Sequence, residues 1–360
     1  MGASRAGRAF IGSFTSAGGL GITVADVDGD TGALTVLAST DVVADPSFLA
    51  VGHAPATGAP VLYAVSETSE GAVAAFDISG TGDAGAPRLI GELRPVDGSG
   101  PTHLAVSAGH LLTANYGSGS VTVLPLRPDG APAAATCLLR HEGSGPDAGR
   151  QADPHAHQVL PDPSGNWLLS VDLGTDSVRV CTLDPATGSL LPHSEAALRP
   201  GAGPRHLAFH PSGRHVYVLN ELEPTVTVCR WDAAAGLLEP VGETPVLPAD
   251  AHDGAGAVRT YPSEPVVSHD GRFLWTANRG HDSISVLTLG ETPEEPVLVA
   301  AVGCGGHWPR DLTLDPTGQW LYAANEHSGS VSWFALDAET GMPSAAGSVE
   351  IPAASCVIFA

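Results

Sequence analysis

Histidine, arginine and acidic side chains recur at two kinds of position in this 360-residue sequence. One set lies where short apolar runs begin: His103, His155, His157, Arg205, His206, Arg310 and Asp311. The other set lies where the following runs end: Glu67, Tyr116, Asp172, Glu221, Arg279 and Glu326. Such groups can move protons, stabilise a developing negative charge or bind a carboxylate or phosphate. What they can do together depends on the elements that position them.

These elements are short strands in a repeated phrase. Residues 204–232 hold an apolar run, a Pro-Ser-Gly turn, a second apolar run and an alternating run. Related phrases begin at Pro46, Pro101, Pro154, Pro262 and Pro309. Short apolar runs between turn residues indicate antiparallel strands, and repeats of about 40 to 50 residues with several strands indicate propeller blades.

Seven such units can be aligned by the residue that closes the second strand of each. These residues are Ser13, Ser66, Asn115, Asp172, Asn220, Asn278 and Asn325. The first unit lacks an inner strand, and residues 355–359 form one strand too many at the other end. The sequence therefore predicts an all-β, seven-bladed propeller with four-stranded antiparallel blades, as a single domain over residues 1–360. The C-terminal strand closes the ring by joining the N-terminal blade, which leaves no exposed sheet edge.

In such a ring, the start of each inner strand and the end of the second strand lie on one face. The two long connections, 141–153 and 248–261, open onto that face and carry Arg150 and Arg259. The chain has a net charge of −23 and its 16 basic residues are all arginine. Arginines gathered at one mouth of an acidic protein indicate a pocket for a small anionic molecule.

Several of these residues also have a purely structural interpretation. The Asn or Asp that ends each second strand is expected to cap the following turn. His206 follows Arg205 directly, so strand alternation predicts that its side chain faces away from the site. Arg205, Glu221 and Arg279 differ from their counterparts in the other units, which favours a role in binding a ligand.

Metal and serine chemistry have little support. His155 and His157 stand two residues apart and could share one side of a strand. No third ligand lies at metal-binding spacing, and there is no Gly-x-Ser-x-Gly motif around a nucleophile. We expect no metal and no cofactor.

Composition excludes other classes of partner. The acidic net charge disfavours nucleic acid, and no apolar run reaches the ~20 residues of a membrane helix. The first ten residues lack the apolar core of a signal peptide, so we expect a cytoplasmic protein. We expect a monomer or a weak homodimer.

Four segments resemble a known family. They are GPRHLAFHP from Gly203, VDLGTD from Val171, Asn220-Glu221, and ANRGHDSI from Ala277. They resemble the seven-bladed lactonase family, which includes propeller-type 6-phosphogluconolactonases and fungal carboxymuconate lactonizing enzymes. The resemblance implies that His157 (or its neighbour His155), Arg205, Glu221 and Arg279 are the catalytic residues.

The leading hypothesis is a lactone hydrolase that opens a phosphorylated sugar lactone. Glu221 or His157 would activate water, and Arg205 or Arg279 would stabilise the oxyanion. The other arginine would bind the substrate anion with Arg310, and His103 and His155 complete the expected substrate-binding set. The alternatives are a cycloisomerase that forms or opens lactones of muconate-type acids, and a propeller that binds a ligand without catalysis.

Overall fold

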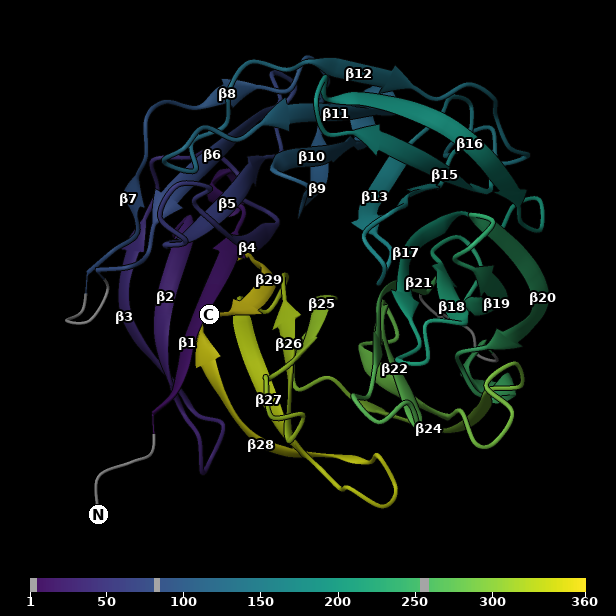
Figure 1. Cartoon of the computed structure of the whole chain (residues 1–360). Coiled ribbons are helices and arrows are strands. Elements are labelled where there is room, and N and C mark those ends of the chain that lie inside the picture. The colour runs from purple at the N-terminus through teal and green to yellow at the C-terminus, as the bar shows by residue number, and fades with distance from the viewer. Residues whose placement is uncertain (1–4, 81–84, 253–258) are drawn as a thin grey trace.

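The computed structural model describes residues 5–80, 85–252 and 259–360. Figure 1 shows seven sheets arranged around a central axis. One edge strand of each sheet lies next to the axis, and the opposite edge strand lies at the rim. The predicted all-β, seven-bladed propeller is confirmed. Within the described residues the only helices are three short 3₁₀ turns: η1 (Thr15–Ala17), η2 (Tyr116–Ser118) and η3 (Ala249–His252). None of these is long enough to cross a membrane.

The blades follow one another along the chain, and the strands of each blade lie in order from the axis outward. Blade 1 comprises β29 (Ala354–Phe359), β1 (Arg5–Ser13), β2 (Ile22–Asp28) and β3 (Leu34–Thr40). Blade 2 comprises β4 (Leu49–His53), β5 (Pro60–Ser66), β6 (Ala72–Asp77) and a divided outer strand, β7 (Arg88–Leu89) and β8 (Arg94–Pro95). Blade 3 comprises β9 (Pro101–Ser107), β10 (His110–Asn115), β11 (Ser120–Pro125) and β12 (Cys137–Arg140). Blade 4 comprises β13 (Ala156–Pro161), β14 (Leu168–Asp172), β15 (Ser177–Asp184) and β16 (Ser189–Ala197).

The remaining three blades repeat this plan. Blade 5 comprises β17 (Pro204–Phe209), β18 (His215–Asn220), β19 (Thr225–Asp232) and β20 (Leu237–Pro245). Blade 6 comprises β21 (Tyr261–Val267), β22 (Phe273–Arg279), β23 (Ser283–Thr288) and β24 (Val297–Gly303). Blade 7 comprises β25 (Pro309–Leu314), β26 (Trp320–Asn325), β27 (Ser330–Leu336) and β28 (Pro343–Glu350).

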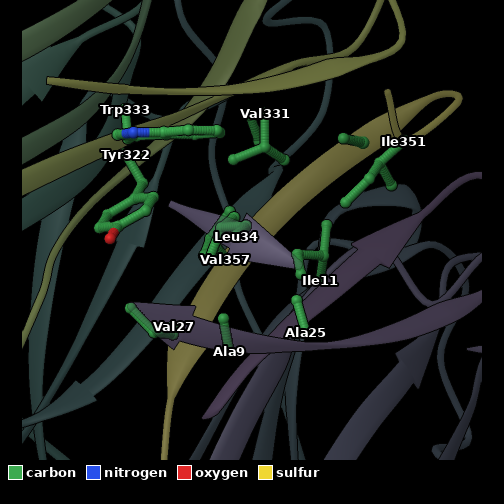
Figure 2. Close-up of a cluster of buried hydrophobic side chains, with 12 residues drawn as sticks. Ala9, Ile11, Ala25, Val27, Leu34, Tyr322, Val331, Trp333, Ile351 and Val357 are labelled. Carbon is green, nitrogen blue, oxygen red and sulfur yellow. The ribbon is translucent and has the colours of Figure 1, made fainter. Parts of the chain in front are cut away.

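The ring closes as the sequence predicted. The C-terminal strand β29 pairs antiparallel with β1, from Ala9 opposite Phe359 to Ser13 opposite Ala354. Closure also buries apolar side chains between the first and last blades. Figure 2 shows this cluster, in which Ile11 and Val27 of blade 1 pack in one core with Val331 and Trp333 of blade 7. Similar clusters join the other neighbouring blades, so apolar burial between sheets stabilises the ring.

The inner strands share an irregularity near their first residues. In six blades the pairing between the inner strand and the second strand shifts by one residue, as in a β-bulge. The unpaired bulge residues are Ser355, Thr102, His157, Arg205, Ser263 with Glu264, and Arg310. A bulge redirects side chains, so these positions are where the fold can turn functional groups toward the axis.

The polar residues that end the second strands cap the following turns, as predicted. Asn115 Nδ2 donates to Ser120 Oγ at 3.1 Å. Asn278 Nδ2 donates to Ser283 Oγ at the same distance. With the turn fixed, the next residue of each blade lies beside the start of the inner strand. These next residues are Phe14, Glu67, Tyr116, Leu173, Glu221, Arg279 and Glu326.

Candidate active site

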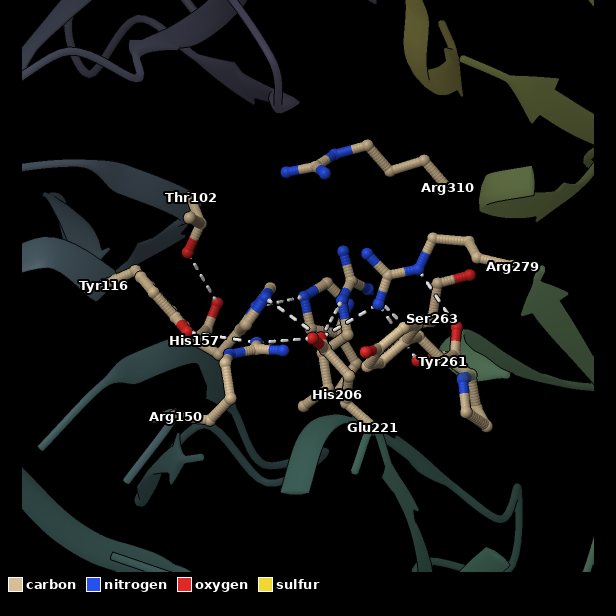
Figure 3. Close-up of polar contacts among 12 residues, drawn as sticks. Thr102, Tyr116, Arg150, His157, His206, Glu221, Tyr261, Ser263, Arg279 and Arg310 are labelled. Atoms are coloured by element: carbon tan, nitrogen blue, oxygen red, sulfur yellow. Dashed lines mark hydrogen bonds and ion pairs between the residues drawn. The ribbon is translucent and has the colours of Figure 1, made fainter. Parts of the chain in front are cut away.

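The Glu221 carboxylate is the centre of a cluster of arginines at one end of the axis (Figure 3). Its Oε1 accepts a hydrogen bond from Arg150 Nη2 at 2.7 Å. Its Oε2 lies 2.9 Å from Arg279 Nη2 and 3.3 Å from Arg205 Nε. The arginines come from three places: the long connection before β13, the end of β22 and the bulge of β17.

The backbone fixes Glu221 in this position. Its N–H donates to the carbonyl oxygen of Gly203 at 2.7 Å, which ties the end of β18 to the start of β17. Gly203 has a φ of +60°, and an added Cβ would lie 2.3 Å from the Leu222 side chain. A glycine is therefore required there by both conformation and space.

The electrostatics of Glu221 follow from these neighbours. Burial alone would raise the pKa of its carboxyl, but Arg279, Arg205 and Arg150 outweigh burial and lower the pKa to about 2. Glu221 is therefore an anion at neutral pH whose oxygens are already engaged by cations.

His157 and His206 lie against the same cluster. His157 Nε2 is 3.9 Å from Glu221 Oε2, and His157 Nδ1 is 3.2 Å from His206 Nε2. His206 Nδ1 is in turn 2.5 Å from Glu264 Oε2. Burial, followed by the charges of Arg205 and His206, lowers the pKa of His157 well below its usual range. His157 is thus a neutral imidazole at pH 7.

Arg310 stands apart from the Glu221 cluster in Figure 3. It pairs with two other carboxylates. Its Nη2 is 3.5 Å from Glu67 Oε2, its Nη1 is 3.4 Å from Glu326 Oε2, and the guanidinium lies over the Phe14 ring. Burial raises the pKa of Glu67, although Arg310 opposes that effect. Arg310 and its two carboxylates therefore form a second ionic group beside the Glu221 cluster.

Comparison with known proteins shows the family of the chain. The model described as "Lactonase, 7-bladed beta-propeller" matches residues 8–359. The chain belongs to this lactonase family. It is 33 % identical to the 6-phosphogluconolactonase of Bacillus subtilis, with 97 % of each chain covered. The crystal structure of the periplasmic gluconolactonase of Pseudomonas aeruginosa superposes with a TM-score of 0.87 at 26 % identity, covering 98 % of each chain.

The lactonase-family fold brings His157, Arg205, Glu221 and Arg279 together, as the sequence analysis expected of them. Whether they are catalytic stays a prediction. Of the two histidines that the sequence could not separate, His157 is the one that reaches Glu221. His155 stacks on Tyr116 with ring centroids 4.4 Å apart, and its Nδ1 is 2.9 Å from the Tyr116 carbonyl oxygen.

His103 is buried beneath the cluster. Its ring lies 4.1 Å from the Phe48 ring and 5.3 Å from the His206 ring, and its Nδ1 is buried without a hydrogen-bond partner among the described residues. This placement favours a packing role for His103, and its expected contact with substrate stays a prediction.

The prediction for His206 was wrong. Strand alternation would direct it away from Arg205, but the bulge leaves Arg205 unpaired between Pro204 and His206, so both side chains face the site. Glu264 was missed for a related reason: it lies in the wider bulge of β21. Glu264 differs from the residues at its position in the other blades, which was an available signal, whereas His206 has a histidine counterpart, His103, in blade 3.

The loop 248–261 also borders the site, through Arg259. Its Nη2 donates to the Leu222 carbonyl oxygen at 3.2 Å, and the guanidinium lies over the Tyr261 ring. Residues 253–258 of this loop lie outside the described residues. In the part of the chain that the structure describes, no group of three or more His, Cys, Asp or Glu side chains could hold a metal ion.

Proposed function

We propose that the protein is a lactone hydrolase that opens a phosphorylated sugar lactone, like the relatives named 6-phosphogluconolactonase. One observation carries the proposal. A buried carboxylate, Glu221, holds Arg205 and Arg279 beside the neutral imidazole of His157. Ester hydrolysis needs a base for water and positive charge for the oxyanion, and this arrangement can supply both.

His157 is the better candidate for the base. Its Nε2 faces the cluster, and the ring is neutral because burial and Arg205 disfavour the imidazolium. Glu221, with its pKa lowered to about 2, is a weak base. We assign Glu221 the role of holding the arginines in place, which decides between the two bases that the sequence left open.

Arg205 and Arg279 are placed to stabilise the reaction. Attack of water on the lactone carbonyl produces a tetrahedral oxyanion, and guanidinium N–H groups fixed in a dry site stabilise such a charge strongly. When the ring C–O bond breaks, the departing alkoxide takes the proton that His157 removed from water. Because Glu221 holds both guanidinium groups in place, the arginine side chains do not have to move during these steps.

Arg150 and Arg310 are the candidates for the substrate's anionic group. The Arg150 side chain is 34 % exposed and that of Arg310 is 17 % exposed, whereas those of Arg205 and Arg279 are almost fully buried. Burial also raises the pKa of Asp311, which favours its neutral form. Guanidinium groups with accessible N–H donors suit a phosphate or carboxylate.

A panel of lactones tests the proposal. Hydrolysis releases an acid, so the fall in pH is followed for 6-phosphogluconolactone, gluconolactone and a carboxymuconolactone, each with and without a chelator. We expect the highest kcat/KM with the phosphorylated lactone and no effect of the chelator. Acid release from none of them would refute lactone hydrolysis, and interconversion of a conjugated muconate, seen by ultraviolet absorbance, would favour the cycloisomerase. The cytoplasmic location and the monomeric or weakly dimeric state also stay predictions, which cell fractionation and sedimentation would check.

A further inference from the structure

We propose that His157, His206 and Glu264 form a proton relay. A proton enters the relay at His157, and Glu264 takes up a proton at its other end. The inference rests on the proposed lactone hydrolysis and adds two positioning residues, His206 and Glu264, to it. The mechanism proposed above uses only His157 and the arginines, and it leaves the buried His206 without a role. The relay gives His206 one.

The geometry is a continuous line of polar atoms leading away from the site. His157 Nε2 faces the Glu221 carboxylate, and His157 Nδ1 lies 3.2 Å from His206 Nε2. His206 Nδ1 lies 2.5 Å from Glu264 Oε2. Each imidazole uses one nitrogen toward the site and the other away from it. This is the arrangement that lets a ring accept a proton on one side and release one on the other.

Two equivalent positions in other blades behave differently. Gln158 and Asp311 each stand one residue after a bulge, as His206 does. Gln158 Oε1 accepts the N–H of Leu207, and Asp311 Oδ2 accepts the N–H of Val357, so both tie neighbouring inner strands together. His206 has no such backbone bond among the described residues and contacts two titratable side chains instead. The backbone bond made by Gln158 and Asp311 therefore does not account for His206. His103, which follows the bulge residue Thr102 in blade 3, also makes no such bond among the described residues, but it contacts no carboxylate there.

The proton movements balance. As the water oxygen bonds to the lactone carbonyl carbon, its proton passes to His157 Nε2. The Nδ1 proton of His157 passes to His206 Nε2, and the Nδ1 proton of His206 passes to Glu264 Oε2. Each ring gains one proton and loses one, so both remain neutral. One negative charge has then moved from Glu264 to the oxyanion beside Arg205 and Arg279. The reverse sequence delivers the proton to the alkoxide when the ring C–O bond breaks.

The charges around the relay favour this outcome over a protonated histidine. Arg205, Arg310 and Arg279 all disfavour a positive charge on His206, with burial the larger effect and Glu221 opposing them. Burial raises the pKa of Glu264, while Arg205, whose Nη1 is 3.8 Å away, opposes the rise. With its pKa raised to about 8, Glu264 is the strongest base of the relay, and its ionised form, which starts the relay, becomes the main form as the pH rises through that value.

The variant Glu264→Gln tests the relay, because an amide can still hydrogen-bond His206 but cannot take up the proton. We expect kcat for the best lactone to fall by roughly 100-fold, with KM little changed. The ascending limb of the pH–rate profile should move to lower pH, since His157 would then act with its own lowered pKa. The matched control is Glu294→Gln, because Glu294 also contacts a histidine and an arginine (His215 and Arg230) but lies on the outside of the ring.

Two outcomes would overturn the relay: a kcat of Glu264→Gln within about twofold of the wild type, or a lower kcat with an unmoved pH limb. A wild type that hydrolyses no lactone would instead refute the proposed function. A second measurement does not depend on activity. Proton NMR of the intact protein should show a strongly deshielded N–H resonance for the contact between His206 and Glu264, and Glu264→Gln should abolish it. Persistence of that resonance in the variant would also refute the relay.

Discussion

Arg205 and His206 are consecutive residues of β17, yet both side chains face the same site. Pro204 pairs with Asn220 and His206 pairs with Leu219, which leaves Arg205 as the extra residue of a bulge. Arg205 Nε then lies 3.3 Å from Glu221 Oε2, while His206 Nε2 lies 3.2 Å from His157 Nδ1. In a regular strand one of the two would point to the opposite face.

This position of Arg205 predicts that lysine cannot replace it. Arg205 contacts Glu221 through Nε and donates from Nη1 to the Ser263 carbonyl oxygen, and a lysine has one nitrogen for both. We expect Arg205→Lys to lower kcat/KM for the best lactone by roughly 100-fold. Arg199→Lys is the matched control, because Arg199 makes a two-point contact with Glu243 on the surface. Equal, small losses in both variants would contradict a role for Arg205 in the reaction.

Glu221→Gln should harm both stability and activity. It leaves three arginines without their shared anion, and breaking a buried ion pair lowers the free energy of unfolding by about 3 kcal/mol. Denaturant melts measure the loss, and steady-state kinetics should show a lower kcat because Arg205 and Arg279 are no longer held. A variant as stable and active as the wild type would remove Glu221 from the centre of the site.

The lowered pKa of Glu221 predicts that the free energy of unfolding falls in acid. Its pKa is lowered in the folded protein, so its stabilising effect is present above the unfolded value of 4.5 and is lost as the pH falls toward about 2. We expect the difference in unfolding free energy between the wild type and Glu221→Gln to shrink across that window. Urea melts at pH 6, 4 and 3 check this, and a constant difference would show that Glu221 does not titrate as described.

Arg150→Met should affect binding of the phosphorylated lactone more than turnover. Arg150 is the most exposed of the four arginines and can hydrogen-bond a phosphate at the mouth. Loss of a charge-assisted hydrogen bond raises KM by roughly 10- to 100-fold. Unphosphorylated gluconolactone serves as the control in the same variant, and a similar rise in KM for both substrates would place the phosphate elsewhere.

A second constellation near the site looks catalytic but is predicted to be structural. Ser170 Oγ is 3.4 Å from His141 Nε2, and His141 Nδ1 is 2.6 Å from Asp172 Oδ2. The side chains of His141 and Asp172 are 0 % exposed, and Asp172 also accepts the N–H groups of His155 and Thr175. We expect Ser170→Ala to keep full activity and to lose about 1 kcal/mol of stability. Loss of activity with unchanged stability would reveal a serine nucleophile.

Much of the fold followed from local pattern. Turn chemistry such as the segment 211–213, repeated with two apolar runs at a period near 50 residues, is enough to predict seven blades. The surplus strand at 355–359 is enough to predict closure, because only pairing with the first blade leaves no free edge. The grouping of Glu221 and Arg279 at one end of the axis followed too, since both come directly after the capped end of a second strand.

Which side chains touch was decided by the tertiary structure. The side chains of His206 and Glu264 face the site because bulges in β17 and β21 change the direction in which single residues point. A bulge cannot be recognised from the alternation of residues in the sequence. The charge state of His157 likewise depends on burial and on Arg205, which lies 48 residues away along the chain and reaches it because the inner strands of blades 4 and 5 pack side by side. Composition and spacing specify which groups the chain can offer, whereas long-range packing sets their distances and their pKa values.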